Sequence, residues 1–198
     1  HPFLRPQFCH AIHQFFSSHL LLLFGVISVV ISAFIILIQK NYKRLLAYSS
    51  IEHAGVMALG FGIGGAAVAA ALLHMVYHSI VKAMLFLTSG NMVLKYRTTK
   101  IDQVRGLLTA MPLTGFSFFI GFFAIAGIPP FGLFYTKFLM LSEGMVRYPL
   151  ITIVTILAFS LVVVGYLKHA MAMLFGPVPE HVSTGEFNRY TTVPIAFL

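Results

Sequence analysis

Apolar residues fill five long blocks of the chain, and short polar segments separate these blocks. The first block, residues 20–38, holds nineteen residues without a charge, which is enough for a helix to cross ~30 Å of hydrocarbon. The others cover residues 45–64, 65–94, 107–145 and 150–167, the last with an amphipathic extension to Phe175. The pattern predicts an all-α integral membrane protein with five transmembrane helices.

The fourth block contains a double proline that breaks it in two. Each proline removes a backbone donor and obstructs the helical turn before it, so we expect two half-helices here. Backbone groups freed in lipid must find protein or water partners. The broken helix at Pro129, Pro130 and Gly132 is therefore expected to face the bundle interior, with Lys137 on the second half-helix.

Composition supports a membrane protein and gives it an orientation. Hydrophobic residues make up 59% of the chain and charged residues 9%, against roughly 25% charged residues in soluble domains. The net charge of +8 comes from residues at the ends of apolar blocks, which indicates membrane topology rather than nucleic-acid binding. If the fourth block crosses once, Arg5 and Arg147 lie on one side. Nine basic residues lie on the other, predicted to be the cytoplasmic side: Lys40, Lys43, Arg44, Lys95, Arg97, Lys100, Arg105, Lys168 and Arg189.

Three segments follow from these patterns. We expect residues 1–18 to be an extramembrane N-terminal segment, residues 19–175 the transmembrane part, and residues 176–198 a tail or loop. The chain begins without an initiator Met, so we expect it to be a fragment, a processed product or a partly traced chain.

The third block carries three ionisable side chains at four-residue steps, namely His74, His78 and Lys82. On a helix this spacing puts them on one face over about 12 Å. A lysine at a bilayer centre costs ~2.5–3.5 kcal/mol even on a lenient scale. The trio therefore indicates a protein that moves or binds charge within a membrane.

Other blocks add Glu52, His53 and Lys137. Glu52 is expected to pair with Lys82 or with Lys137, whereas His53 is equally explained as a packing residue. His74 and His78 lie one turn apart on one face, so they cannot bind one haem iron from opposite sides. No Glu or Cys accompanies them in a zinc motif, and we expect no metal site.

Three segments resemble the antiporter-like membrane subunits of respiratory complex I and its relatives. They are KNYKRLLAYSSIEHAGVM (residues 40–57), LLHMVYHSIVKAMLFLTSGN (72–91) and MPLTGFSFFIGFFAIAGIPPFGLFYTKFLML (111–141). Within this family, Glu52 makes the chain similar to the large membrane subunit of energy-converting hydrogenases of the hydrogenase-4 and formate hydrogenlyase type. Lys137 is more similar to complex I or to cation/proton antiporters.

The resemblance implies a fold of two inverted five-helix repeats, of which these blocks match the second, C-terminal one. It implies a non-catalytic, proton- or Na⁺-translocating subunit of a complex I-like redox complex. Lys82 is then the central proton carrier, His74 and His78 relays, Lys137 the exit-side group and Glu52 a coupling carboxylate, with His53 on the same axis. We expect no cofactor in this chain, and iron–sulfur clusters and possibly a NiFe centre in partner subunits.

The expected partners are other membrane subunits, including the first repeat, and lipid, but no nucleic acid. The expected location is a prokaryotic cytoplasmic membrane. Two alternatives remain open: a subunit of a multi-subunit Na⁺/H⁺ antiporter without a redox partner, and a degenerate half-subunit that serves as a scaffold.

Overall fold

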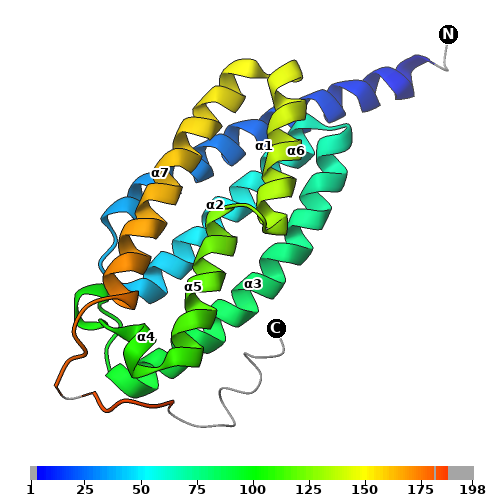
Figure 1. Ribbon diagram of the computed structural model, residues 1–198. Coiled ribbons are helices and arrows are strands. Elements are labelled where there is room, and N and C mark those ends of the chain that lie inside the picture. Colours follow the sequence, from blue (N-terminus) through cyan, green and yellow to red (C-terminus); the bar gives the residue numbers. More distant parts are fainter. Residues whose placement is uncertain (1–3, 181, 187–198) are drawn as a thin grey trace.

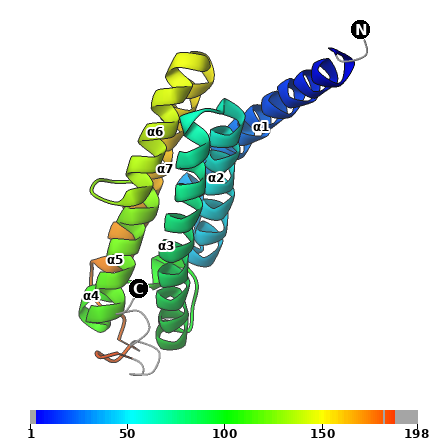
Figure 2. The same ribbon diagram turned by 90° about the vertical axis from the view of Figure 1, so that its right-hand side faces the viewer.

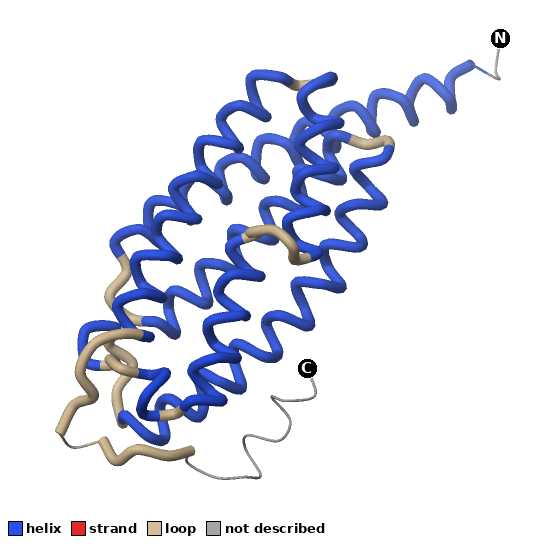
Figure 3. The backbone as a smooth tube through the Cα atoms, viewed as in Figure 1, coloured by secondary structure: helices blue, strands red, loops and turns tan. Residues whose placement is uncertain are grey.

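The computed structural model describes residues 4–180 and 182–186, with side chains from Phe16 onwards. Helices account for most of this part of the chain (Figures 1 and 3). They are α1 (Leu4–Ile38), α2 (Tyr42–Ile63), α3 (Ala66–Tyr96), the 3₁₀ turn η1 (Ile101–Gln103), α4 (Leu107–Ala110), α5 (Pro112–Ala126), α6 (Gly132–Arg147) and α7 (Pro149–Leu174).

Local sequence explains both ends of α2. Asn41 precedes the helix, and its side-chain oxygen accepts hydrogen bonds from the amides of Lys43 and Arg44 at 3.0 and 3.2 Å, as an N-cap residue does. The helix ends where Gly64 and Gly65 adopt φ angles of 77° and 59°. Side chains rarely tolerate this region, so the two glycines allow the sharp turn into α3.

The helices pack side by side around an apolar core that encloses a row of ionisable side chains. α2 packs against α1 and α3, α1 against α7, and α3 against both α5 and α6. Large apolar side chains such as Phe24, Ile38 and Leu157 are 61–73% exposed, whereas Glu52 and His53 are fully buried. Apolar groups outside and ionisable groups inside are the arrangement expected of an integral membrane protein.

α5 and α6 together run the length of α3. They contain 15 and 16 residues, against 31 in α3, and lie end to end beside it (Figure 1). The loop between them contains the double proline, as expected. The carbonyl group of Ile125, in the last turn of α5, faces inward, but Pro129 and Pro130 of the loop are exposed. Figure 2 shows this loop at the outer edge of the molecule, away from α1.

The carbonyl group freed at the break thus faces the bundle interior as expected, whereas the two prolines lie on the surface of the chain. Proline has no N–H to satisfy, and the loop satisfies its other amides locally. The amide of Gly127 donates to Ala124, that of Ile128 to Phe123, and that of Phe131 to Ile128.

Most of the basic residues gather at one end of the bundle, which we call the basic end. There α1 and α3 end, α2 begins, and Asn41 bridges to Lys100. The basic end carries Lys40, Lys43, Arg44, Lys95, Arg97, Lys100, Arg105 and Lys168, whereas Arg189 lies outside the described residues. Arg147 lies at the other end, beside Gly65.

The expectation of membrane-crossing helices is confirmed in part. Within the described residues, three helical stretches are long and apolar enough to cross a membrane: Phe16–Ile38, Ala66–Tyr96 and Pro149–Leu174. Pro112–Ala126 is apolar but shorter. α1 is helical from Leu4, so the backbone of the segment expected outside the membrane is helical over most of its length.

Candidate functional site: a buried chain of ionisable residues

A buried ion pair joins α2 to the second half-helix. Lys137 Nζ lies 2.9 Å from Glu52 Oε1, with side-chain exposures of 7% and 0%. Of the two partners left open for Glu52, the structure selects Lys137. A Cβ at Gly127 would lie 3.2 Å from Lys137 Cδ, so the glycine of the helix break leaves room for the lysine stem. The ammonium lies 4.4 Å from the ring centre of Phe159 on α7.

A row of hydrogen bonds begins at His53, beside this pair. His53 Nε2 lies 3.2 Å from Glu52 Oε2 and 3.1 Å from the carbonyl oxygen of Ile125. His53 Nδ1 lies 2.8 Å from His74 Nε2, and His74 Nδ1 lies 2.7 Å from Thr136 Oγ1. The row therefore links α2, α3 and α6. It also gives His53 polar contacts that a packing residue does not need.

The acceptors around His53 determine which ring nitrogen carries the proton. Because Nε2 faces two oxygen acceptors, the neutral ring holds its proton there, and Nδ1 is left as an acceptor. His74 then donates from Nε2 to His53, and the Thr136 hydroxyl donates to His74 Nδ1. In the neutral row the donors thus point from Thr136 through His74 to His53, whose Nε2 proton is donated to the Ile125 carbonyl oxygen.

One added proton reverses this row without stranding a donor. A doubly protonated His53 donates from Nδ1 to His74, which donates from Nδ1 to Thr136. The Thr136 hydroxyl turns to the carbonyl oxygens of Leu133 or Gly132, which lie 3.1 and 3.2 Å away. Every donor keeps an acceptor in both arrangements, so the row can take up and release a proton.

His78 and Lys82 lie further along the same face of α3. The His78 ring is 4.6 Å from the ring of His53, centre to centre. Its buried Nε2 has no hydrogen-bond partner among the described residues. Lys82 is 6% exposed and donates to the carbonyl oxygen of Leu46 and the hydroxyl of Ser49 on α2. His74, His78 and Lys82 therefore all face α2, and they share one face of α3 as their spacing predicts.

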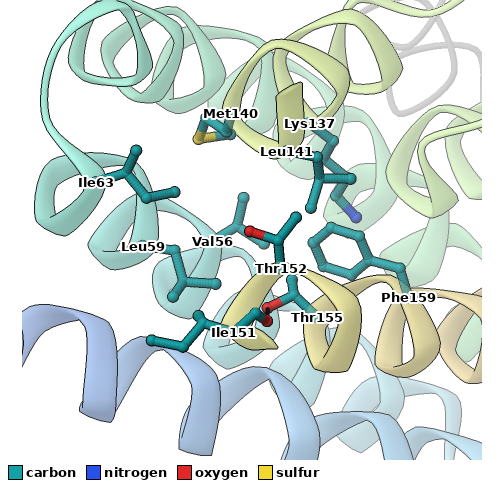
Figure 4. A pocket seen from close by; sticks show the side chains of 10 residues that line it. All are labelled: Val56, Leu59, Ile63, Lys137, Met140, Leu141, Ile151, Thr152, Thr155 and Phe159. Atoms are coloured by element: carbon teal, nitrogen blue, oxygen red, sulfur yellow. Dashed lines mark hydrogen bonds between the residues drawn. The ribbon is translucent and has the colours of Figure 1, made fainter. Parts of the chain in front are cut away.

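Two cavities meet at Lys137. The first, of about 20 Å³, has room for one water molecule and lies between α2, α6 and α7 (Figure 4). Its lining includes Lys137 and the side chains of Thr152 and Thr155. The second, of about 390 Å³, is an open groove between α6 and α7 that Lys137, Phe138 and Ser160 help to line. Lys137 thus stands between the buried row and the surface.

The described residues contain no group of three or more His, Cys, Asp or Glu side chains that could hold a metal ion. The buried ionisable groups are joined to one another and to hydroxyl and carbonyl groups instead. This arrangement can hold and pass protons.

Comparison with known proteins identifies the family. The family described as "NADH:quinone oxidoreductase/Mrp antiporter, TM" matches residues 3–163. The chain belongs to this antiporter family. A hydrogenase-4 component F homolog from Methylacidiphilum infernorum is 42% identical over 140 residues, which cover 70% of this chain and 29% of that protein.

Solved structures of redox complexes share the fold of this antiporter-family chain. A chain of an archaeal membrane-bound sulfane sulfur reductase matches with a TM-score of 0.81 and 30% identity, over 91% of this chain and 37% of the other. A chain of respiratory complex I from Thermus thermophilus shares the fold with a TM-score of 0.82 at 23% identity, over 91% and 39%. The chain spans well under half the length of these relatives.

Sequence reasoning on this antiporter-family chain missed several polar partners. Thr136 joins His74 to α6, and Ser49 receives the Lys82 ammonium. Both are polar residues within apolar stretches, Thr136 directly before Lys137 and Ser49 three residues before Glu52, and this proximity could have pointed to them. The carbonyl oxygens of Leu46 and Ile125 gave none, because every residue has a carbonyl and only the fold shows which one is aimed at a site.

Proposed function

We propose that this chain is a proton- or Na⁺-translocating membrane subunit of a complex I-like redox complex, associated with a hydrogenase. Electron transfer in partner subunits changes the protonation of the buried row, and ions move in response. Membership of the antiporter family and similarity to a hydrogenase-4 component F homolog support this assignment.

The observation that carries the proposal is the reversible hydrogen-bond row whose last ring, His53, lies 3.2 Å from the carboxylate of a buried ion pair. A charged pair in the interior is costly to build and is not needed for stability. Intramembrane ionisable residues of this kind mark ion pathways. The row spans three helices and has an acceptor for each donor in both of its proton states.

Each residue then has a distinct role. Lys82 is the central proton carrier, and His74 and His78 are relays that reach His53. Glu52 is the coupling carboxylate, because its charge acts on both His53 and Lys137. Lys137 is the exit-side group, a role supported by its position between the small cavity and the open groove.

The assembly supplies what this chain lacks. In the proposal α1, α2, α3 and α7 cross the membrane, α5 and α6 together make the fourth crossing, and a first repeat supplies the other half of the conduit. This chain binds no redox cofactor, and partner subunits carry the iron–sulfur clusters and a NiFe centre. The location is a prokaryotic cytoplasmic membrane.

Ion pumping by the assembled complex in sealed vesicles tests the function. Replacing Lys82→Ala removes the central carrier, so redox-driven acidification or Na⁺ uptake should fall to background. The matched control is Lys95→Ala on the same helix, whose half-buried side chain lies at the basic end and bonds to Ser183 and Gly185. It should pump like the wild type.

Pumping and coupled turnover that survive Lys82→Ala in an assembled complex would sink the proposed role. Survival after simultaneous replacement of His74, His78 and Lys82 would favour a scaffold. The family description also names Mrp antiporters, so co-purification separates the two transport functions. Iron–sulfur and NiFe subunits support the redox complex, and small membrane antiporter subunits support a Na⁺/H⁺ antiporter.

A further inference from the structure

A third hollow lies at the basic end, away from the buried row. It has a volume of about 360 Å³ and lies between the end of α1, the end of α7 and the η1 turn. Its lining includes Ile38, Gln39 and Lys40 from the end of α1, Asp102 and Arg105 from the η1 region, and Lys168 and His169 from α7. His169 donates from Nε2 to the carbonyl oxygen of Ile36 at 2.8 Å, and so ties α7 to α1 beneath the hollow.

The hollow carries an excess of positive charge. Lys40, Arg105 and Lys168 face one carboxylate, Asp102, which leaves two uncompensated charges. None of the three cations forms an ion pair within residues 16–180 and 182–186. Arg105 bonds through Nε to the backbone oxygen of Asp102 at 3.2 Å, so most of its guanidinium donors remain available for an anion.

Apolar stripes run from this hollow along both helices. On α1 the exposed residues Ile27, Ile31, Phe34 and Ile38 follow helical spacing, and Ile38, 73% exposed, lines the hollow. On α7, Leu157 and Val164 are exposed on the face that ends at Lys168. The α1 stripe covers eleven residue steps, or about 16 Å of helix, close to half of the ~30 Å hydrocarbon thickness, and the two α7 residues lie seven steps apart.

We propose that this hollow binds one phospholipid with a net-negative headgroup. The headgroup phosphate occupies the hollow between Arg105 and Lys168, and the acyl chains lie along the apolar stripes. Basic pockets between membrane helices recognise anionic headgroups in this way. The position of a basic hollow at the end of an apolar stripe of about 16 Å favours a lipid over a soluble anion, because a free phosphate makes no contact with the apolar stripe.

Lipid binding to the full chain in detergent tests the site, with native mass spectrometry to resolve each bound lipid. The probes are phosphatidylglycerol and phosphatidylcholine with identical acyl chains. We expect one phosphatidylglycerol to bind roughly tenfold more tightly than phosphatidylcholine. The double variant Lys168→Gln with Arg105→Gln should lose most of this preference, since each nearby basic residue contributes about 1 kcal/mol.

Matched variants separate a site from general charge. Lys43→Gln with Arg44→Gln removes two exposed charges from the same end outside the hollow, and it should keep the preference. Lys168→Arg with Arg105→Lys conserves the charge and should also keep it. An equal loss in the Lys43 and Arg44 variant would overturn the site, as would no preference in the wild type.

Two further binding measurements test whether something other than a lipid occupies the hollow. Inorganic phosphate at the same concentration should not displace the lipid. If it does so with equal affinity, the site binds a free anion and the lipid proposal is wrong. The second measurement repeats the binding in the assembled complex: a preference lost on assembly would mean that a partner subunit covers the hollow.

Discussion

The Glu52 carboxylate has two neighbours of different character. Oε1 lies 2.9 Å from the Lys137 ammonium, whereas Oε2 lies 3.2 Å from the ring of His53, which is charged only when it binds a proton. A proton on His53 therefore creates a second ion pair and weakens the hold of Glu52 on Lys137. Coupling between the row and the exit-side lysine follows from this shared carboxylate.

The ion pair predicts an unequal response to single and double substitution. Lys137→Met leaves the buried carboxylate of Glu52 without its cation and should lower the free energy of unfolding by about 3–5 kcal/mol. Adding Glu52→Gln removes the stranded charge, so the double variant should recover at least half of the loss. Denaturant unfolding in detergent measures both values.

Lys43→Met is the control for this comparison, because it removes an exposed lysine from the surface of α2, the helix that carries Glu52. It should change stability by less than about 0.5 kcal/mol. Additive effects of the two substitutions at Glu52 and Lys137 would contradict a direct pair, since coupled residues deviate from additivity.

At the scale of single residues, the sequence predicted which side chains matter but not how they pair. Helical spacing was enough to put His74, His78 and Lys82 on one face. The choice between Lys82 and Lys137 as the partner of Glu52 depended on how far α6 lies from α2, a tertiary distance that spacing along the chain does not contain. The same holds for Thr136, whose hydroxyl reaches His74 across helices.

The start of α6 is held by close contact with α3. A Cβ on Gly132 would lie 2.6 Å from Cε2 of Tyr77, whereas a Cβ on Gly90 of α3 would meet nothing within 4 Å. Gly132 therefore allows α6 to contact α3 closely where the broken helix resumes, whereas a side chain at Gly90 would meet no neighbour.

Alanine substitution at Gly132 and at Gly90 should have different effects on the stability of the fold. Gly132→Ala forces the Tyr77 ring or the half-helix to move and should destabilise the fold by about 1–3 kcal/mol. Gly90→Ala adds a helix-favouring residue without a clash and should be neutral or stabilise by up to about 1 kcal/mol. The unfolding midpoint in detergent measures both.

A second substitution tests the cause of the Gly132 effect. Tyr77→Leu removes the ring, and combined with Gly132→Ala it should restore most of the stability lost. If Gly132→Ala costs the same with and without the ring, the clash is not the reason for the glycine.

At the scale of elements, the apolar blocks predicted α2, α3 and α7 well, because long blocks and glycine turns are local signals. They did not separate α4 from α5, which divide where Pro112 begins a new helix after Met111. They also placed Pro129 and Pro130 inward. A proline break has no intrinsic side, and only the packing of its two half-helices decides where the loop points.

The whole molecule joins distant parts of the chain at the basic end, where the segment after α7 crosses back over α3, α4 and α5. Gly185 donates its amide to Ala110 at 2.8 Å, and Lys95 donates to Ser183 and Gly185. Sequence reasoning gave this segment only as a tail or loop. Its contacts join residues more than 70 positions apart, and no local pattern announces them.

Glu186 fastens this segment to the start of α5 and gives it a measurable role. Its carboxylate accepts hydrogen bonds from the amides of Leu113 and Thr114 at 2.8 and 3.1 Å and from the Thr114 hydroxyl at 2.7 Å. It thus satisfies amides that have no partner within the helix, and its negative charge interacts favourably with the positive end of the α5 dipole.

Glu186→Ala should lower stability by about 0.5–2 kcal/mol and speed protease cleavage within residues 176–186. Glu180→Ala, at an exposed position in the same segment, is the matched control and should change neither quantity. Equal cleavage rates in the two variants would mean that the segment is held by its other contacts, and that the first half-helix keeps its place beside α3 without a cap from the far end of the chain.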